Sequence, residues 1–380
     1  MKRINIKNAF LKSVEKNKNI STEGSKPKFW LSSGNYLINK VLAGRYTGCF
    51  PQGRISGLTG PSGSGKSFIL SNAINQAVKE EYSVLIIDSE RALDEEYLAK
   101  IGVDVESESI SYISTNRITD AAGSIQSMCK FYHDARTSGE IDDMPKLLIV
   151  VDSLDALYTD SMMDKYDETG DLGNDQGLHA KKLKQLLQTL VYNVGLLPAI
   201  VICTKQPYVD QTPNVAIPWK ISEAIKYPFT VLGLITKLME KDAKTKEYNG
   251  IKLRVFGFKT RLTKPYQRCE ILVPYDTGLD PYEGLLPVAV AEGIVTQKGA
   301  WFYFGEHKFQ GANAWHPYKE AIFQAIVAKD VKYIDIAEGE EELPAGITPT
   351  KKAEMKDAIK RLQEKVKRGE KIDDEDEGAA

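Results

Sequence analysis

Residues Gly60–Ser67 read GPSGSGKS, between the apolar run GRISGLT and the helical pattern FILSNAINQAVK. They match the GxxxxGK[ST] pattern in the strand, loop and helix context in which it forms a phosphate-binding (Walker A) loop. Glycines let successive backbone N–H groups point at a phosphate, and the helix N-terminus adds partial positive charge. The alternative is a glycine-rich turn that contains a lysine by chance. The pattern predicts a site for ATP and Mg²⁺ made of Gly60, Pro61, Ser62, Gly63, Ser64, Gly65, Lys66 and Ser67.

Composition narrows the class of protein. The chain has 380 residues, 42% of them hydrophobic and 27% charged, and a formal net charge of -2, so any site for a polyanion must be a local patch. Its 4 cysteines are far apart with no CxxC pair, which argues against a zinc site and a disulfide framework. No apolar segment has the length of a signal peptide or a membrane span. We expect a cytoplasmic protein without a membrane partner.

Short apolar, β-branched runs recur along the chain with helical segments between the first several. Runs that are apolar throughout are typical of strands buried on both faces, so we expect a mostly parallel, doubly wound α/β sheet whose last strands are antiparallel. We expect an N-terminal arm (1–30), a core domain (31–280), a small C-terminal α/β or helical domain (281–345), and a basic helix with an acidic tail (346–380). The predicted strands lie within RISGLTG, YSVLIIDSE, KLLIVVDSLDAL, PAIVICTKQ, FTVLGLITKL, LRVFGFKTR and CEILVPYD.

Two predicted strands end in acidic residues. Asp152 follows five apolar residues in LLIVVDSLDAL and is the candidate second Mg²⁺ anchor (Walker B); its alternative is a helix N-cap. VLIIDSE supplies Asp88 and Glu90. We choose Glu90 as the general base because it lies further past the strand, while Asp88 could equally be a structural cap.

Five stretches, in order and spacing, resemble the RecA-type recombinases, most closely the phage branch of the UvsX kind. The similarity runs from about residue 29 to about 324. The resemblance implies a RecA-like core and a filament-forming, DNA-dependent ATPase that acts on single-stranded DNA and homologous duplex DNA. The stretches are GRISGLTGPSGSGKS, LIIDSERALDEEYLAKIGVD, LLIVVDSLDAL, GFKTRLTKPYQRCEIL and YDTGLDPYEGLLPVAVAEGIVTQKGAWFYF.

The resemblance also assigns residues. Glu90 matches the catalytic glutamate of the family, and Asp94 and Tyr97 match adenine-side contacts, although Tyr97 could instead be a half-buried helix residue. Lys259 and Arg261 match two cations that enter the neighbouring subunit's ATP site; the alternative is a pair of solvated charges on an exposed strand end. Tyr275 matches a further cross-subunit contact near the adenine.

Two stretches that lack helical or strand patterns, Asp160–Gly177 and Pro207–Ser222, fall where the family has DNA-binding loops. The usual Gly-Gly pair near the end of the second is absent. After PAIVIC the family has a glutamine or histidine that senses the γ-phosphate; this chain has Thr204, Lys205 and Gln206, of which we favour Gln206. The DNA-contacting candidates are Lys181, Lys182, Lys184, Tyr208, Trp219 and Lys220, and for the first three the alternative is the solvated face of an amphipathic helix.

The resemblance gives roles to the two ends of the chain. The arm, with Phe10 and Leu11, is the candidate for docking on the next protomer, and the tail DDEDE either restrains duplex DNA entry or adds solubility. Mediator and single-strand-binding proteins are expected partners, and the location is the host cytoplasm if a phage encodes the chain. A hexameric helicase-type motor and a non-catalytic RecA-like regulatory module remain alternative functions.

Overall fold

The computed structural model describes Phe10, Ser13 and residues 26–138, 144–171, 176–210, 218–241, 247–311 and 314–334. The chain divides into two compact units, one ending at Asp280 and the other beginning at Pro281. Most of the expected arm lies outside the described residues, and so do the predicted basic helix and acidic tail.

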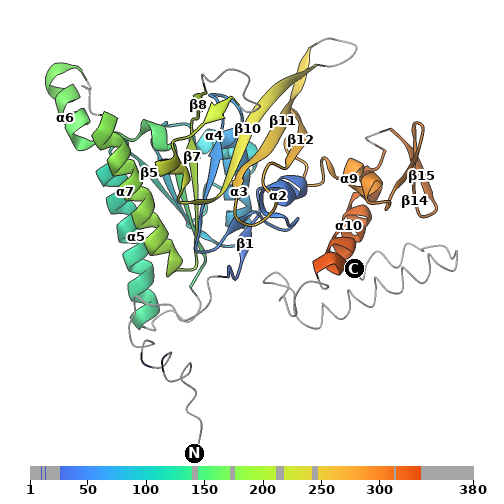
Figure 1. Ribbon diagram of the computed structural model, residues 1–380, viewed down its shortest axis with the longest axis horizontal. Helices are drawn as coiled ribbons and strands as arrows, with labels where there is room; N and C mark the ends of the chain where they lie inside the picture. Colours follow the sequence, from blue (N-terminus) through green and yellow to red (C-terminus); the bar gives the residue numbers. More distant parts are fainter. Residues whose placement is uncertain are drawn as a thin grey trace, which may run out of the picture. The chain divides into compact units, whose positions relative to one another are not determined.

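A large sheet forms the centre of the first unit (Figure 1). Within the described residues its strand order is β12-β11-β10-β3-β7-β6-β4-β5, parallel from β10 to β5 and antiparallel along β10, β11 and β12. The mostly parallel α/β fold predicted from the apolar runs is therefore confirmed. The strands are β3 (Ile55–Thr59), β4 (Ser83–Asp88), β5 (Ile110–Ser114), β6 (Leu147–Asp152), β7 (Ala199–Lys205), β10 (Phe229–Lys241), β11 (Tyr248–Thr260) and β12 (Arg268–Pro274).

Each central strand feeds two hydrophobic cores because its side chains alternate between the faces of the sheet. Val84 and Ile86 of β4 belong to the core on one face, whereas Leu85 and Ile87 belong to the core on the other. The first core is closed by α2 (Tyr36–Ala43), α3 (Lys66–Lys79) and α4 (Glu95–Ile101), and the second by α5 (Ile118–Ser138), α7 (Gln176–Gly195) and α8 (Glu223–Lys226). The sheet is doubly wound, as predicted.

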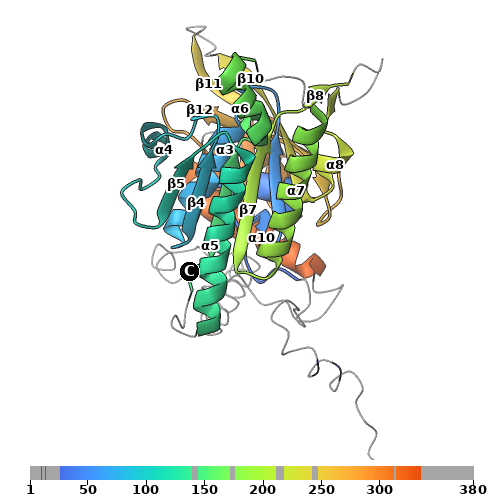
Figure 2. The same cartoon turned by 90° about the vertical axis from the view of Figure 1, so that its left-hand side faces the viewer.

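The helices α5 and α7 lie side by side across the second face (Figure 2). They are 21 and 20 residues long. Even so, within the part of the chain that the structure describes, no helix combines the length and apolar character needed to cross a membrane.

The strand β5 is absent from the sequence-based prediction. It forms the edge of the sheet beside β4, and only part of each side chain is covered. Its residues, ISYIS, mix serines with apolar residues instead of forming a continuous apolar run. An edge strand needs less burial than a central one, which explains why the criterion used for the other strands missed it.

The first predicted DNA loop is largely helical, so the prediction of a loop there is wrong. Residues Asp160–Thr169 form α6, which Thr159 caps by accepting a hydrogen bond from the Met162 N–H and which Gly170 ends in the left-handed conformation. No residue of α6 is buried. Because the helix has no apolar face, hydrophobic periodicity gives no sign of it.

Arg117 anchors α6 from outside. Its guanidinium contacts carboxylates of Asp160, Asp164 and Asp167 at 3.5, 2.9 and 3.4 Å. The three acids recur at helical spacing, which places them on one face of α6.

The second predicted loop contains a short antiparallel pair, β8 (Tyr208–Val209) and β9 (Trp219–Lys220). Its middle, residues 211–217, lies outside the described residues. The remaining short elements of the first unit are β1 (Trp30–Leu31), β2 (Phe50–Pro51) and η1 (Leu154–Ala156).

The second unit combines helices with a small sheet, β13-β14-β15. Phe309 and Trp315 are buried together with Ile322 and Phe323 of its longest described helix. Its elements are α9 (Leu285–Ala291), β13 (Thr296–Lys298), β14 (Trp301–Phe304), β15 (His307–Gln310), η2 (His316–Tyr318) and α10 (Lys319–Ile334).

A pair of glycine substitutions tests the packing under β3. A methyl group on Gly57 would lie 2.7 Å from Leu232 Cδ1 and 2.8 Å from Phe229 Cε1, so Gly57→Ala should lower the free energy of unfolding by about 1–3 kcal/mol through overpacking. Gly123 in α5 has open space around it, and Gly123→Ala should be neutral or stabilising by up to about 1 kcal/mol. Urea unfolding checks both; equal stabilities for the two variants would contradict the packing.

Candidate nucleotide-binding site

The P-loop (Gly60–Ser67) connects β3 to α3 and lies directly against the backbone of β10. A Cβ atom on Gly60 would be 2.2 Å from the Ile235 carbonyl oxygen, so only glycine fits there. Gly65 has a φ of +103°, and a Cβ there would be 2.8 Å from Leu253 Cδ2. The strand pair β10–β11 therefore forms the floor of the loop and fixes its path.

Lys66 begins α3 and folds back into the loop. Its ammonium group donates to the carbonyl oxygens of Gly60 and Pro61, at 3.0 and 3.1 Å. Burial lowers the pKa of Lys66, while the negative charges of Glu90, Asp152 and Asp155 oppose that shift. A mostly buried ammonium group at the start of a helix suits a phosphate group.

Asp152 ends β6 and is 1% exposed. Its carboxylate accepts hydrogen bonds from the hydroxyls of Ser67, at 2.9 Å, and Thr204. Burial raises the pKa of Asp152, and the two hydroxyls oppose that shift. A divalent cation beside Ser67 and Asp152 would offset the burial of this charge, and oxygen ligands are those that Mg²⁺ prefers.

The described residues do not offer a complete metal cage. Within the described residues no group of three or more His, Cys, Asp or Glu side chains is placed to hold a metal ion. Mg²⁺ commonly binds through one or two protein groups together with phosphate oxygens and water. Ser67 and Asp152 therefore fit a metal that arrives with a nucleotide.

The surroundings of Asp88 and Glu90 differ. Asp88 is fully buried and its carboxylate accepts from the backbone N–H groups of Glu90, Ala92 and Leu93 and from the Tyr112 hydroxyl, at 2.7–3.2 Å. Its lone pairs are used to shape the turn after β4. Glu90 is exposed, and its role as general base stays a prediction.

Lys205, at the end of β7, forms an ion pair with Asp155. Both side chains are mostly buried, with exposures of 18% and 26%. The backbone N–H of Gln206 donates to the same carboxylate. The assignment of Gln206 as phosphate sensor stays a prediction. Thr204 and Lys205 contact Asp152 and Asp155, two of the acids that act on Lys66.

The adenine-side candidates have structural contacts. Asp94 is the N-cap of α4 and accepts from the Tyr97 N–H at 2.8 Å. Tyr97 is half-buried and packs against the first core, and burial raises the pKa of its hydroxyl. Tyr275, just after β12, is 55% exposed. Contact of these three residues with adenine stays a prediction.

Lys259 and Arg261 gather around one aromatic ring. The Lys259 ammonium donates to the carbonyl oxygens of Lys226 and Tyr227, and the Arg261 guanidinium donates to that of Tyr227. Both cations also lie over the Tyr227 ring, 5.6 and 5.4 Å from its centre. Tyr227 is 73% exposed and is a residue that sequence patterns did not single out.

This cation cluster (Lys259, Arg261 and Tyr227) lies far along the sheet from the P-loop of the same chain. Thr260 pairs with Val231, which pairs with Ser56 near the start of β3, whereas the P-loop follows the end of β3 at Thr59. With a rise of about 3.3 Å per residue, the two levels are separated by roughly 10 Å along the strand. The structure thus places Lys66, Ser67, Asp152 and Glu90 together and the cation cluster elsewhere.

The DNA-binding candidates are separate from the P-loop residues in sequence. Lys181, Lys182 and Lys184 are exposed on α7, whose Leu183 and Leu187 face the core. Tyr208 is 53% exposed on β8. Trp219 is half-buried and the Lys220 ammonium pairs with Asp210 at 2.7 Å on the neighbouring strand segment. Their contact with DNA stays a prediction.

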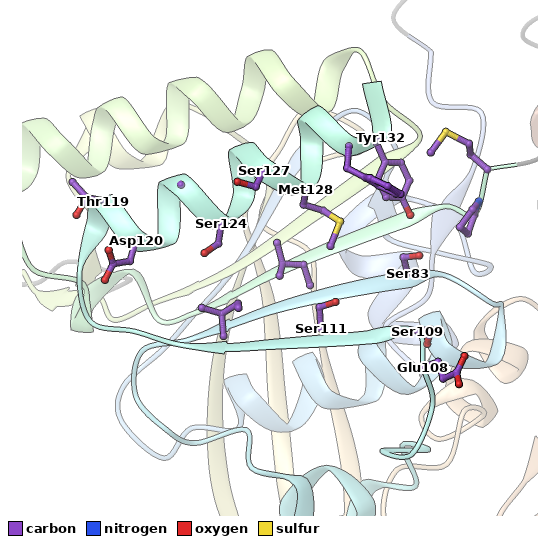
Figure 3. A pocket seen from close by; sticks show the side chains of 16 residues that line it. Ser83, Glu108, Ser109, Ser111, Thr119, Asp120, Ser124, Ser127, Met128 and Tyr132 are labelled. Carbon is purple, nitrogen blue, oxygen red and sulfur yellow. The ribbon is translucent and has the colours of Figure 1, made fainter. Parts of the chain in front are cut away.

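A groove between the edge strand β5 and helix α5 contains none of these candidates (Figure 3). Serine hydroxyls line much of it, and Phe131, which is 60% exposed, borders it with Met128 and Tyr132. Sequence patterns gave no sign of it because β5 was not predicted.

Comparison with known proteins identifies the family. The family model described as RecA N-terminal domain matches residues 12–280. The chain is 29% identical over 364 residues to Protein RecA of Thermus aquaticus, covering 90% of this chain and 98% of that protein. It is 30% identical over 300 residues to Protein RecA of Corynebacterium glutamicum (strain R), covering 77% of this chain and 73% of that protein. With Protein RecA of Treponema denticola the identity is 27% over 281 residues, covering 73% and 63%. This chain belongs to the RecA family.

Proposed function

We propose that this chain is an ATP-dependent DNA recombinase of the phage UvsX kind, which assembles as a helical filament on single-stranded DNA and pairs it with homologous duplex DNA. Membership of the RecA family implies a DNA-dependent ATPase that uses ATP and Mg²⁺. The main support for the proposal is that Lys66, Ser67, Asp152 and Glu90 lie close together near the carboxyl ends of the parallel strands. The cation cluster lies apart from these four residues.

Each residue at the P-loop has a defined task in this proposal. The loop N–H groups and Lys66 bind the phosphates, and Ser67 and Asp152 hold the metal. Bound Mg²⁺ would neutralise part of the negative charge on the phosphate oxygens. Glu90 orients a water molecule for attack on the γ-phosphate and accepts its proton, so that ATP and water become ADP and phosphate.

The cation cluster supports a site shared by two subunits. Within one chain Lys259 and Arg261 contact the backbone of Lys226 and Tyr227, whereas the P-loop follows the far end of β3. We propose that they enter the ATP site of the adjacent protomer and stabilise charge on the transferring phosphoryl group. Self-association is then required for turnover.

DNA contacts complete the proposal. Lys181, Lys182 and Lys184 would neutralise phosphates, and Tyr208, Trp219 and Lys220 would contact bases and backbone. Exposed lysines on α7 and the exposed ring of Tyr208 support this role. Mediator and single-strand-binding proteins, and action in a host cytoplasm, belong to the same proposal.

A strand-exchange assay tests the function. The protein with ATP, Mg²⁺, single-stranded DNA and homologous duplex should form joint molecules, while a heterologous duplex should give none. Directional unwinding without strand exchange would instead identify a helicase-type motor. Phosphate release that DNA does not stimulate would identify a nucleotide-binding regulatory module.

Lys66→Ala should reduce ATP turnover by at least about 100-fold, since the phosphates lose their main protein cation. The matched control is Lys79→Ala, which removes an exposed lysine from the other end of α3 and should leave turnover unchanged. Phosphate release with saturating single-stranded DNA measures both. Turnover near the normal rate in Lys66→Ala would refute the site.

Arg261→Ala should also reduce turnover by at least about 100-fold while the fold is kept, because the exposed guanidinium acts across an interface. Mixing it with Lys66→Ala protein should restore part of the activity, because a subunit with Arg261 then lies beside an intact P-loop. Both variants are nearly inactive alone, so the mixture has a low background. If no ratio of the two restores phosphate release, the shared site is contradicted.

Lys259 gives a pH test of the same site. Burial, and then the positive charges of Arg261 and Lys226, lower the pKa of Lys259 to about 8, with Glu223 opposing the shift. The ammonium is charged below this pKa and neutral above it, so kcat/KM for ATP should fall as pH rises through about 8. Lys259→Arg keeps its charge and should move the loss to higher pH. An identical alkaline limb in both proteins would show that Lys259 is not the titrating group.

A further inference from the structure

The side chain of Ser153 joins the two strand ends that carry the acidic residues of the site. Ser153 directly follows Asp152 of β6 and is fully buried. Its hydroxyl donates a hydrogen bond to the Oε1 atom of Glu90, which follows β4. A serine hydroxyl has one hydrogen to donate, so this donor is committed to Glu90.

Ser153 is itself fixed on both sides of its backbone by Ser89. The Ser89 hydroxyl accepts from the Ser153 N–H at 2.9 Å and donates to the Ser153 carbonyl oxygen at 2.7 Å. The Ser89 N–H donates to the Asp152 carbonyl oxygen at 2.8 Å, where the paired strands bring Asp88 opposite Asp152. The hydroxyl that reaches Glu90 therefore projects from a rigid frame.

Hydrogen bonds also fix the backbone of Glu90. Its side-chain conformation is the part that can still change. Its N–H donates to Asp88 Oδ1 at 3.2 Å and approaches the Asp152 carbonyl oxygen at 3.4 Å. The Glu90 side chain is exposed, and a glutamate has several rotatable bonds. A hydrogen bond to a carboxylate is among the stronger hydrogen bonds in proteins, so one donor is enough to select a rotamer.

We propose that Ser153 is a positioning residue for hydrolysis, holding the Glu90 carboxylate where it can orient the attacking water. The inference rests on the proposed function, in which Glu90 is the general base. In this proposal Ser153 acts through its hydrogen bond to Glu90. A misplacement of about 1 Å in a reacting group can lower a rate by about 100-fold, which sets the scale of the effect.

The test is a double-mutant cycle on DNA-stimulated ATP hydrolysis by the full chain. Ser153→Ala should lower kcat by about 10–100-fold and change KM for ATP by less than about 3-fold, because the P-loop contacts remain. In a Glu90→Gln background, the same substitution should cause no further loss, because the group that Ser153 positions is already altered. Binding of a fluorescent ADP analogue to every variant reports that the nucleotide site is folded.

Two further variants sharpen the result. Ser56→Ala is the matched control: Ser56 is fully buried in β3, its hydroxyl has no partner among the described residues, and its loss should leave kcat unchanged. Ser153→Cys keeps the shape of the side chain but donates weakly, and should give a kcat between those of wild type and Ser153→Ala. If Ser153→Ala does not bind nucleotide, the kcat of Ser153→Cys is used to test the inference instead.

The outcomes separate the inference from the proposed function. A normal kcat in Ser153→Ala, or in a folded Ser153→Cys when the alanine variant does not fold, overturns the inference. So does a loss confined to KM, or an equal further loss in the Glu90→Gln background. If Glu90→Gln itself turns over ATP normally, the assignment of the general base in the proposed function fails.

Discussion

A buried carboxylate holds this nucleotide site together. Asp152 lies at the end of a central strand, almost without solvent, and accepts hydrogen bonds from Ser67 at the start of α3 and Thr204 at the end of β7. A buried charge of this kind is tolerated only when hydrogen bonds and an opposite charge satisfy it. The two hydroxyls supply part of that requirement and the Lys66 ammonium contributes at longer range. A metal ion bound with nucleotide would supply the rest.

The surroundings of the site come from several strands of the sheet. The P-loop is pressed against β10 at Gly60, and Asp88 and Asp152 lie opposite each other at the ends of β4 and β6. The positive side chains of Lys259 and Arg261 lie at one end of the β10–β11 pair, over the exposed ring of Tyr227, whereas the P-loop lies against the middle of that pair. One chain thus carries a cradle and a set of cations that do not meet each other. In the proposed filament, each chain contributes its cradle to one nucleotide and its cations to the next.

The sequence predicted those features that a short stretch of residues is enough to define. The P-loop matches a sequence motif and Asp152 follows a continuous apolar strand, so their place at the carboxyl ends of strands could be predicted. It missed the edge strand Ile110–Ser114, whose residues are only half covered, and the helix Asp160–Thr169, which has no apolar face. Ser153 and Tyr227 could not be assigned because their contacts come from strands and turns far apart in the chain. The hydrogen bonds that Asp88 accepts from the turn after β4 likewise could not be predicted, because they depend on how that turn folds back.

The central claim is that ATP binds between two copies of the chain. Electron microscopy of the protein on single-stranded DNA with a non-hydrolysable ATP analogue tests it most directly. The account predicts an open helix in which each nucleotide contacts Lys66 of one subunit and Lys259 and Arg261 of the next. A nucleotide enclosed by a single subunit, with both cations far from every phosphate, would contradict it.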